Sequence, residues 1–181
     1  MMNLRDNFIV VTVGILLLIL ATQIIVPLYP VPITLQTAAV LVIALMYNRK
    51  TALQTILCYI LLGILGLPVF AKYSSGTSTV LGKTGGYILG FLVCVYVVNL
   101  LRKKFGDSRW LYIFTYAIIG HSIICLMGVV QLSYFIGVSE AIEFGLMPFI
   151  FPAIVKSLLA IFVVKITQKY FLVHPVKALN I

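Results

Sequence analysis

The sequence predicts an all-α membrane protein with six transmembrane helices in a single domain spanning residues 1–181. The first observation behind this prediction is composition: 62% of the 181 residues are apolar and only 9% are charged, whereas soluble domains carry about 25% charged residues. The second is a mean hydropathy of +1.18, which leaves too little polar surface to cover a water-soluble globule. The third is the regular alternation of long apolar runs with short polar segments.

Six apolar runs account for the predicted helices. A helix that crosses the bilayer needs roughly 20 mostly apolar residues, and the runs cover residues 8–27, 31–47, 51–66, 85–101, 110–136 and 148–166. The second and third runs are short, so neighbouring helices or the interface must accommodate them. The first run is too long for the apolar region of a signal peptide and is expected to be a retained span.

The distribution of charge predicts the orientation of these spans. Six spans place both termini on one side, which would carry ten of the thirteen Lys and Arg residues: Arg5, Arg49, Lys50, Arg102, Lys103, Lys104, Arg109, Lys165, Lys169 and Lys177. The other side would carry Lys72 and Lys83. The positive-inside rule then places both termini in the cytoplasm, as in a multi-pass protein of the bacterial cytoplasmic membrane. The net charge of +9 suits the anionic inner leaflet of the lipid bilayer and predicts no nucleic-acid partner.

The segment Gly82-Lys83-Thr84 matches the end of a nucleotide-binding P-loop, but the rest of that motif is missing. The pattern needs a glycine at the position of Thr77, and it needs a strand before it and a helix after it. The predicted topology also places this segment on the outer face, where no useful ATP pool exists. We therefore expect its glycines and hydroxyl groups to form a loop over a solute pocket; a plain surface loop is the alternative.

Lys156 is the most informative single residue because it lies inside the last apolar run. A charged side chain at the bilayer centre costs at least about 2.5–3.5 kcal/mol, so such a residue is a candidate functional site. The alternative is that its side chain extends to the outer interface, from which about two helical turns separate it. No acidic residue lies in any span, so Lys156 lacks an internal counter-ion. This favours an anionic ligand such as a carboxylate.

Other polar residues in the spans are weaker candidates. His121 is expected to pack between helices rather than relay protons, and Gln36, near the outer start of the second run, has a better case for lining a pocket. The three cysteines are far apart, which predicts no metal site. No catalytic motif is present either, so we expect a non-enzymatic protein that captures a solute with no energy source or cofactor of its own.

Four segments in order along the chain resemble the signatures of the BioY family, the biotin-specific substrate-capture component of energy-coupling factor transporters. They are residues 31–37 (VPITLQT), residues 63–70 (GILGLPVF), residues 81–87 (LGKTGGY), and Pro148 and Phe149 with Lys156. The resemblance covers most of the chain. It implies six helices, an outward-facing biotin pocket capped by loops, and a transmembrane scaffold and two ATPase subunits as partners.

The resemblance also implies a set of ligand-binding residues. Lys156 would pair with the ligand carboxylate. Ser74, Gly76 and Tyr87 would belong to the outer loop and its edge, and Thr34 and Gln36 would be polar lining.

The chain departs from the family pattern at several of these positions. Ala153 replaces an Asp three residues before Lys156, Ser74 aligns with an Asn that helps to hold biotin, and Ile88 aligns with an Arg of some members. Lys83 stands where Pro is usual, and the first run lacks the A-x-x-x-A face that the family uses to meet its scaffold. Two alternatives to biotin capture follow: uptake of another small carboxylate such as lipoate, or a structural membrane subunit without a solute.

Overall fold

The computed structural model describes residues 3–106 and 109–173, with side chains through residue 169. The described chain is a helical bundle with a short two-stranded hairpin. The helices are α1 (Leu4–Gln23), α2 (Gln36–Met46), α3 (Arg49–Ile64), α4 (Thr77–Leu81), α5 (Gly85–Phe105), α6 (Trp110–Ile136), α7 (Val138–Gly145) and α8 (Met147–Val173). A 3-10 turn, η1, spans Ala71–Tyr73, and β1 (Ile25–Val26) pairs antiparallel with β2 (Ile33–Thr34).

The fold agrees with the predicted helical membrane protein, and its helix lengths refine the prediction. Within the described residues, four helical segments are long and apolar enough to cross a membrane: α1, α5, α6 and the α7–α8 segment Val138–Lys169. The third run forms the 16-residue α3 and the second only the 11-residue α2. At 1.5 Å per residue α2 is about 16 Å long, roughly half the hydrocarbon thickness.

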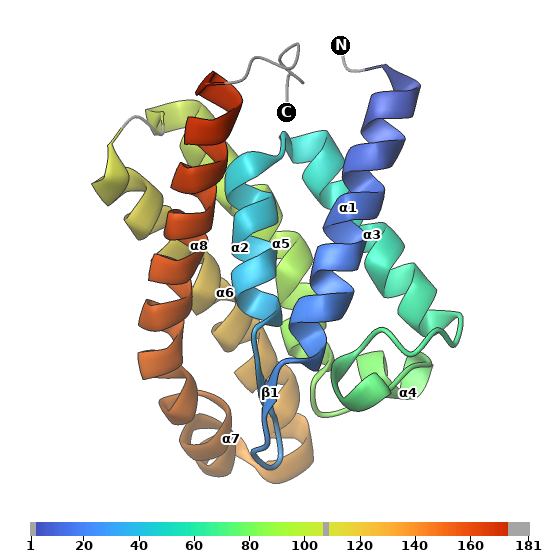
Figure 1. The fold of residues 1–181 in the computed structure, drawn as a ribbon. Coiled ribbons are helices and arrows are strands. Elements are labelled where there is room, and N and C mark those ends of the chain that lie inside the picture. Colours follow the sequence, from blue (N-terminus) through green and yellow to red (C-terminus); the bar gives the residue numbers. More distant parts are fainter. Residues whose placement is uncertain (1–2, 107–108, 174–181) are drawn as a thin grey trace.

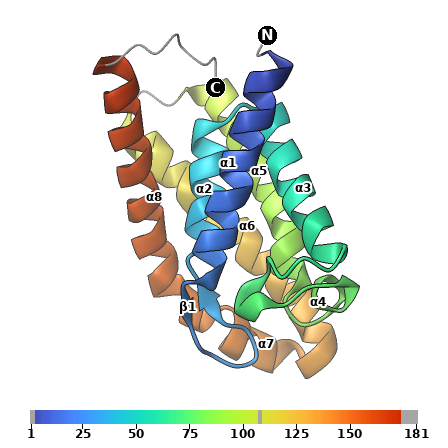
Figure 2. The ribbon, with the colours of Figure 1, turned by 45° about the vertical axis from the view of Figure 1, so that its right-hand side comes forward.

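Helix α2 is short because prolines occupy the start of its apolar run. Pro30 and Pro32 cannot donate backbone hydrogen bonds to a helix, and the segment around them instead forms the β1–β2 hairpin, with Ile25 opposite Thr34. The helix is buried on every side, packs against α1, α5, α6 and α8, and lies in the middle of the bundle in both ribbon views (Figures 1 and 2). Neighbouring helices therefore surround α2 with apolar side chains, although α2 is too short to cross the hydrocarbon layer by itself.

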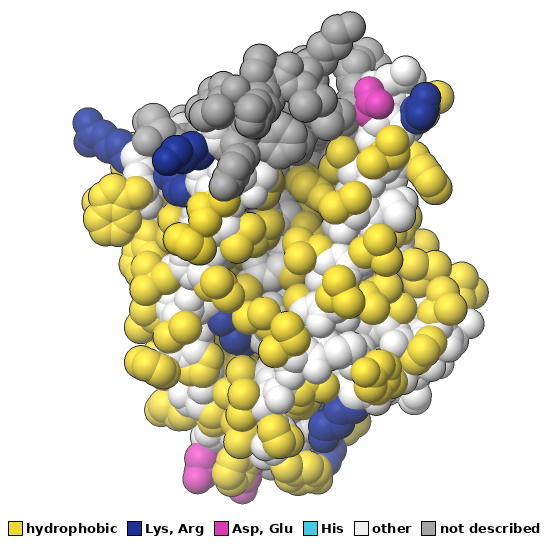
Figure 3. Space-filling model, viewed as in Figure 1, with side chains coloured by type: hydrophobic (Ala, Val, Ile, Leu, Met, Phe, Trp, Pro, Cys, Tyr) yellow, Lys and Arg dark blue, Asp and Glu magenta, His cyan; other side chains and the backbone are white. Residues whose placement is uncertain are grey.

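The two ends of the bundle differ. The start of α1, the turn between α2 and α3, and the end of α8 lie at one end, whereas the hairpin, α4 and α7 lie at the other (Figures 1 and 2). Apolar side chains cover much of the middle of the face shown in Figure 3, and most charged side chains in that view lie towards the two ends. This banding is the pattern expected of a protein surrounded by lipid.

Candidate functional site

A pocket lies at the hairpin end of the bundle, enclosed by the hairpin, the start of α2, the segment from Phe70 to Thr84, the start of α5, and α8. Its volume is about 250 Å³, just below the range usual for drug-sized ligands, so it suits a small solute. Five of the six residues expected at the site line it: Thr34, Gln36, Ser74, Tyr87 and Lys156. Residues from opposite ends of the sequence thus converge on one cavity.

Lys156 places a single amine inside this pocket. Its side chain is only 8% exposed, and its Nζ donates a hydrogen bond to Thr37 Oγ1 at 3.2 Å. Lys72, which is exposed, also borders the pocket, and none of the described lining residues is acidic. A buried cation without an acidic neighbour is costly unless an anion joins it, so the pocket is suited to an anionic group at Lys156.

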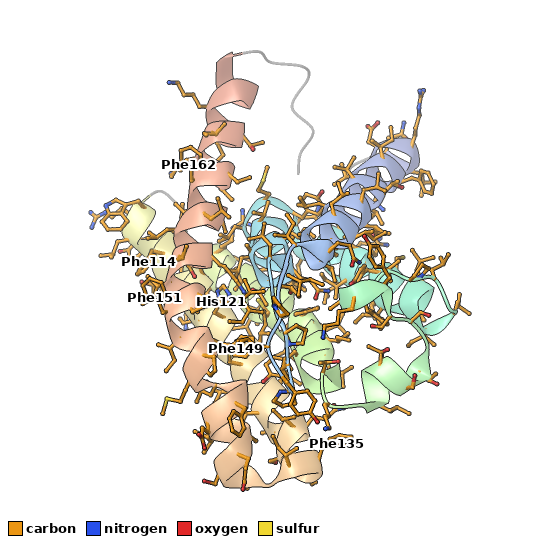
Figure 4. All side chains as sticks on the ribbon, turned by 60° about the horizontal axis from the view of Figure 1, so that its bottom comes forward. Phe114, His121, Phe135, Phe149, Phe151 and Phe162 are labelled. Carbon is orange, nitrogen blue, oxygen red and sulfur yellow. The ribbon has the colours of Figure 1, made fainter. Side chains whose placement is uncertain are left out.

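A hydrogen-bonded chain holds the Lys156 amine in place. His121 Nε2 lies 3.1 Å from the same Thr37 Oγ1, and His121 Nδ1 lies 3.2 Å from Ser157 Oγ. We assign the donors so that Lys156 donates to Thr37, Thr37 to His121, and His121 to Ser157, which uses each hydrogen once. His121 is 4% exposed and lies on the interior side of α8 (Figure 4). The expectation that His121 packs between helices agrees with this position.

Gln36 is held by a second set of hydrogen bonds. Its Nε2 donates to the Tyr59 hydroxyl at 2.8 Å, and that hydroxyl donates to the Val69 carbonyl at 2.8 Å. These contacts join α2 and α3 to the loop that begins the pocket rim. One amide hydrogen of Gln36 is therefore used within the protein, and its carbonyl oxygen and second amide hydrogen are the groups that it can offer to a ligand.

Tyr87 contributes its ring to the pocket, because its hydroxyl binds elsewhere. The hydroxyl donates to the Gly145 carbonyl of α7 at 2.7 Å, and the ring stacks against Phe149 with centroids 5.7 Å apart. Phe70 and Phe91 also line the cavity. In Figure 4 Phe149 lies on the interior side of α8 and Phe151 on its outer side. The pocket therefore has an aromatic and apolar wall beside its polar end.

The loop before α4 contributes Ser74 but not Gly76. Ser74 Oγ donates to the Ala71 carbonyl at 2.8 Å, which leaves its oxygen lone pairs for a ligand donor. Gly76 is absent from the lining residues; it has a φ of +86° at the start of α4, and its N–H donates to the Gly63 carbonyl at 2.7 Å. Gly76 thus shapes the loop, since a positive φ suits glycine.

The residues that depart from the family pattern fall in different places. Ile88 is 5% exposed and lines the pocket, so an apolar side chain occupies that part of the wall. Ala153 lies instead along a separate groove between α6 and α8, which His121 also borders. Because residue 153 is Ala, Lys156 has no carboxylate three residues before it on α8.

The segment Gly82-Lys83-Thr84 connects two helices and has no P-loop geometry. Helix α4 precedes it where a P-loop needs a strand. Lys83 Nζ donates to the Tyr29 hydroxyl at 3.0 Å and lies 5.1 Å from the centre of that ring. The hydrogen bond from Lys83, together with its positive charge, favours the phenolate and lowers the pKa of Tyr29. The contact joins the hairpin loop to the loop before α5 beside the pocket.

Sequence reasoning missed several residues of the site. Thr37 was visible only as the last letter of VPITLQT, and its hydroxyl proves to connect Lys156 with His121. Phe149 was noted as part of a motif, without a role. Thr79 and Thr84 line the pocket as well. The hydroxyl-rich composition of their loop was the signal for Thr79, and Thr84 also lies in the LGKTGGY segment.

The fold and the pocket define a class: a small helical membrane protein that can enclose an amphipathic anion between an amine and an aromatic wall. The BioY family model matches residues 1–172. The chain belongs to the BioY family.

Named relatives agree with this assignment. The chain is 37% identical to the "Probable biotin transporter BioY" of Rickettsia prowazekii over 82% of this chain and 76% of the relative. It is 38% identical to the protein of the same name from Pyrococcus horikoshii over 81% and 86%, and 34% identical to the "Biotin transporter BioY" of Thermotoga maritima over 80% and 85%.

The crystal structure at 2.1 Å of the S-component for biotin from an ECF-type ABC transporter has the same fold, with a TM-score of 0.80 at 21% identity over 93% of this chain and 95% of that one. The expectation of a transport protein rather than an enzyme is confirmed by the family.

Proposed function

We propose that this chain is the biotin-capturing component of an energy-coupling factor transporter, with Lys156 as the anchor of the biotin carboxylate. The observation that carries the proposal is the buried Lys156 amine in a pocket whose described lining holds no acid. The names of the relatives supply the ligand class. The aromatic wall of Tyr87 and Phe149 would face the apolar part of biotin, while Thr34, Gln36 and Ser74 would bind its polar ring.

The proposed topology has six spans and both termini in the cytoplasm. Helices α2 and α3 would be the two short spans, shielded from lipid by their neighbours. The clustering of Lys and Arg at the end of the bundle opposite the pocket supports this orientation. An impermeant maleimide applied to intact cells should then label Ser78→Cys and not Lys104→Cys. The unsubstituted chain is the control for background labelling of the native cysteines. The reverse pattern would contradict the orientation.

We further propose a transmembrane scaffold and two ATPase subunits as partners in the bacterial cytoplasmic membrane. Support comes from the solved structure of similar fold, which is titled as part of an ECF-type ABC transporter. Cells that make this chain with those subunits should then accumulate labelled biotin faster than cells that make the chain alone. Equal rates would mean that the chain acts without them.

Calorimetry on the purified protein tests the anchor. The unsubstituted protein should bind biotin about tenfold to a hundredfold more tightly than neutral biotin amide, because a charged hydrogen bond contributes about 1.5–3 kcal/mol. Lys156→Met should bind both equally weakly. Lys165→Met is the matched control, since Lys165 is exposed on the same helix. A Lys156→Met protein that still prefers the carboxylate would overturn the anchor role.

The same assay separates the alternatives. Ile88 places an apolar group in the wall, which favours a ligand with a less polar head as the second candidate. Tighter binding of lipoate than of biotin would support that candidate. A folded protein that binds neither ligand would support a structural subunit without a solute.

A further inference from the structure

A second hollow lies at the end of the bundle opposite the substrate pocket. It is about 470 Å³ in volume and lies between the turn that joins α2 to α3 and the last turns of α5. In Figure 1 that turn is at the upper end of the molecule, far from the hairpin and α7. Biotin capture as proposed above makes no use of this hollow.

The hollow is strongly basic. Arg49, Lys50, Arg102 and Lys103 line it, and no acidic side chain is among the residues of the described chain that do so. Arg49, Lys50 and Lys103 are exposed around its opening. Arg49 and Lys50 also form the first turn of α3, where the helix dipole adds positive potential. Four cations in one concave site favour an anionic ligand.

Hydrogen bonds fix the inner wall of the hollow. Arg102 Nη1 donates to the Ala44 carbonyl at 3.0 Å and to the Tyr47 carbonyl at 3.2 Å. Asn99 Nδ2 donates to the same Ala44 carbonyl at 3.2 Å. Asn48 Oδ1 accepts from the Thr51 N–H at 3.0 Å and so caps α3. The α2–α3 turn is thereby tied to α5, and the basic residues of α3 and α5 lie on opposite sides of the hollow.

A row of partly exposed apolar side chains on α5, here called the apolar lane, leads to this hollow. Leu89, Val93, Tyr96 and Leu100 are 38–44% exposed and follow one another at helical spacing. Leu100 borders the hollow, and the Arg49 guanidinium lies 5.6 Å from the centre of the Tyr96 ring. A phosphate site continuous with an apolar helix face matches a phospholipid, whose headgroup adjoins acyl chains. A soluble phosphate would have no use for the apolar lane.

We propose that this hollow binds the phosphate of an anionic phospholipid, with Arg49, Lys50 and Lys103 around the headgroup and the acyl chains along α5. Basic pockets between helices at a membrane interface bind such headgroups. Each cation near a lipid surface contributes enough to change affinity about fivefold, so the removal of three should weaken binding about a hundredfold.

Native mass spectrometry of the full chain with phosphatidylglycerol or phosphatidylcholine tests the proposal. The unsubstituted protein should retain phosphatidylglycerol in preference to phosphatidylcholine. Arg49→Gln, Lys50→Gln and Lys103→Gln combined should weaken phosphatidylglycerol binding about a hundredfold. The matched control combines Lys104→Gln, Lys165→Gln and Lys169→Gln, which removes the same charge from residues that do not line the hollow. Arg102 is left intact because it holds the α2–α3 turn.

Several outcomes would overturn the proposal. Equal weakening of lipid binding by both triple variants would mean that the anionic lipid is attracted to basic residues in general. Displacement of the lipid by millimolar inorganic phosphate would mean that the hollow is a site for soluble phosphate. Unchanged lipid binding with lost co-purification of the transporter scaffold would mean a protein docking surface. If the triple variant does not fold, judged by circular dichroism, Lys50→Gln and Lys103→Gln are measured singly. Each should cost about fivefold, and no change in either would reject the site.

Discussion

Lys156 makes opposing contributions to stability and to binding. A buried cation without an acidic partner destabilises the folded state, and its hydrogen bond to Thr37 offsets only part of that cost. An apolar chain of similar volume would remove the penalty. With Lys156 as the proposed anchor, the pocket would keep a residue that suits the ligand at the expense of the empty protein, a common feature of binding sites.

The first prediction concerns this trade-off at the residue scale. Lys156→Met should raise the unfolding temperature of the ligand-free protein, because replacing a buried charged group by a well-packed apolar one often stabilises by about 1–4 kcal/mol. Thermal unfolding in detergent measures the change, with Lys165→Met as the exposed control. A lower unfolding temperature for Lys156→Met alone would mean that the amine supports the fold.

At the scale of elements, the close contact of α5 with α6 depends on glycine. A Cβ at Gly86 would lie 2.3 Å from the Met127 carbonyl oxygen of α6, which is backbone and cannot move independently of its helix. Small residues allow this approach between membrane helices. Because Gly86 precedes Tyr87, the contact also sets where the aromatic wall of the pocket stands.

The second prediction follows from that contact. Gly86→Ala should lower the free energy of unfolding by about 1–3 kcal/mol through overpacking and should weaken biotin binding by moving Tyr87. Leu89→Ala, at a half-exposed position on the same helix, is the control and should leave binding unchanged. Denaturant unfolding and calorimetry measure the two effects. Equal binding by Gly86→Ala and the unsubstituted chain would contradict the packing argument.

The third prediction concerns the Lys83–Tyr29 contact between two loops. Lys83 donates to the phenol oxygen and its charge favours the phenolate, which lowers the pKa of Tyr29. The contact should therefore strengthen as the pH rises through that lowered pKa, and it is weakest below it, where the phenol is neutral. The part of the tyrosinate absorbance that is lost in Tyr29→Phe reports the ionisation of Tyr29. Its titration midpoint should lie at higher pH in Lys83→Gln than in the chain with Lys83. Identical midpoints in the two backgrounds would show that Lys83 does not act on Tyr29.

At the scale of the whole molecule, the pocket closes only through parts of the chain that are distant in sequence. Lys72 and Ser74 border it from the loop before α4, and Thr37 and Lys156 meet in it from α2 and α8. A ligand held by all these elements should restrain the loop while it is bound. The opposite end of the bundle should respond little.

The fourth prediction uses the trypsin sites at the two ends. Biotin at about 100 times its Kd should slow cleavage after Lys72 and Lys83 by up to about a hundredfold, because cleavage requires the loop to leave an occupied pocket. Cleavage after Lys103 and Lys104 should keep its rate and serves as the internal control. Mass spectrometry of the fragments measures both. Equal slowing at the two ends would indicate general stabilisation instead of loop closure.

The sequence by itself determined the class of protein, the membership in the BioY family and five of the residues that line the pocket. Apolar runs are local in the chain, so composition and run length predict helices without knowledge of their neighbours. The run at 110–136 coincides with α6. Motif residues such as Lys156, Tyr87 and Gln36 were identifiable because an unusual residue in an apolar run, or a familiar short pattern, is visible in one dimension.

Only the tertiary structure decided how those residues act. It turned the Tyr87 hydroxyl towards Gly145 and made Thr37 the link to Lys156 across 119 positions. It also brought the basic ends of α3 and α5 around one hollow. These features depend on which helices lie side by side, and packing between distant segments leaves no periodic trace in a single sequence.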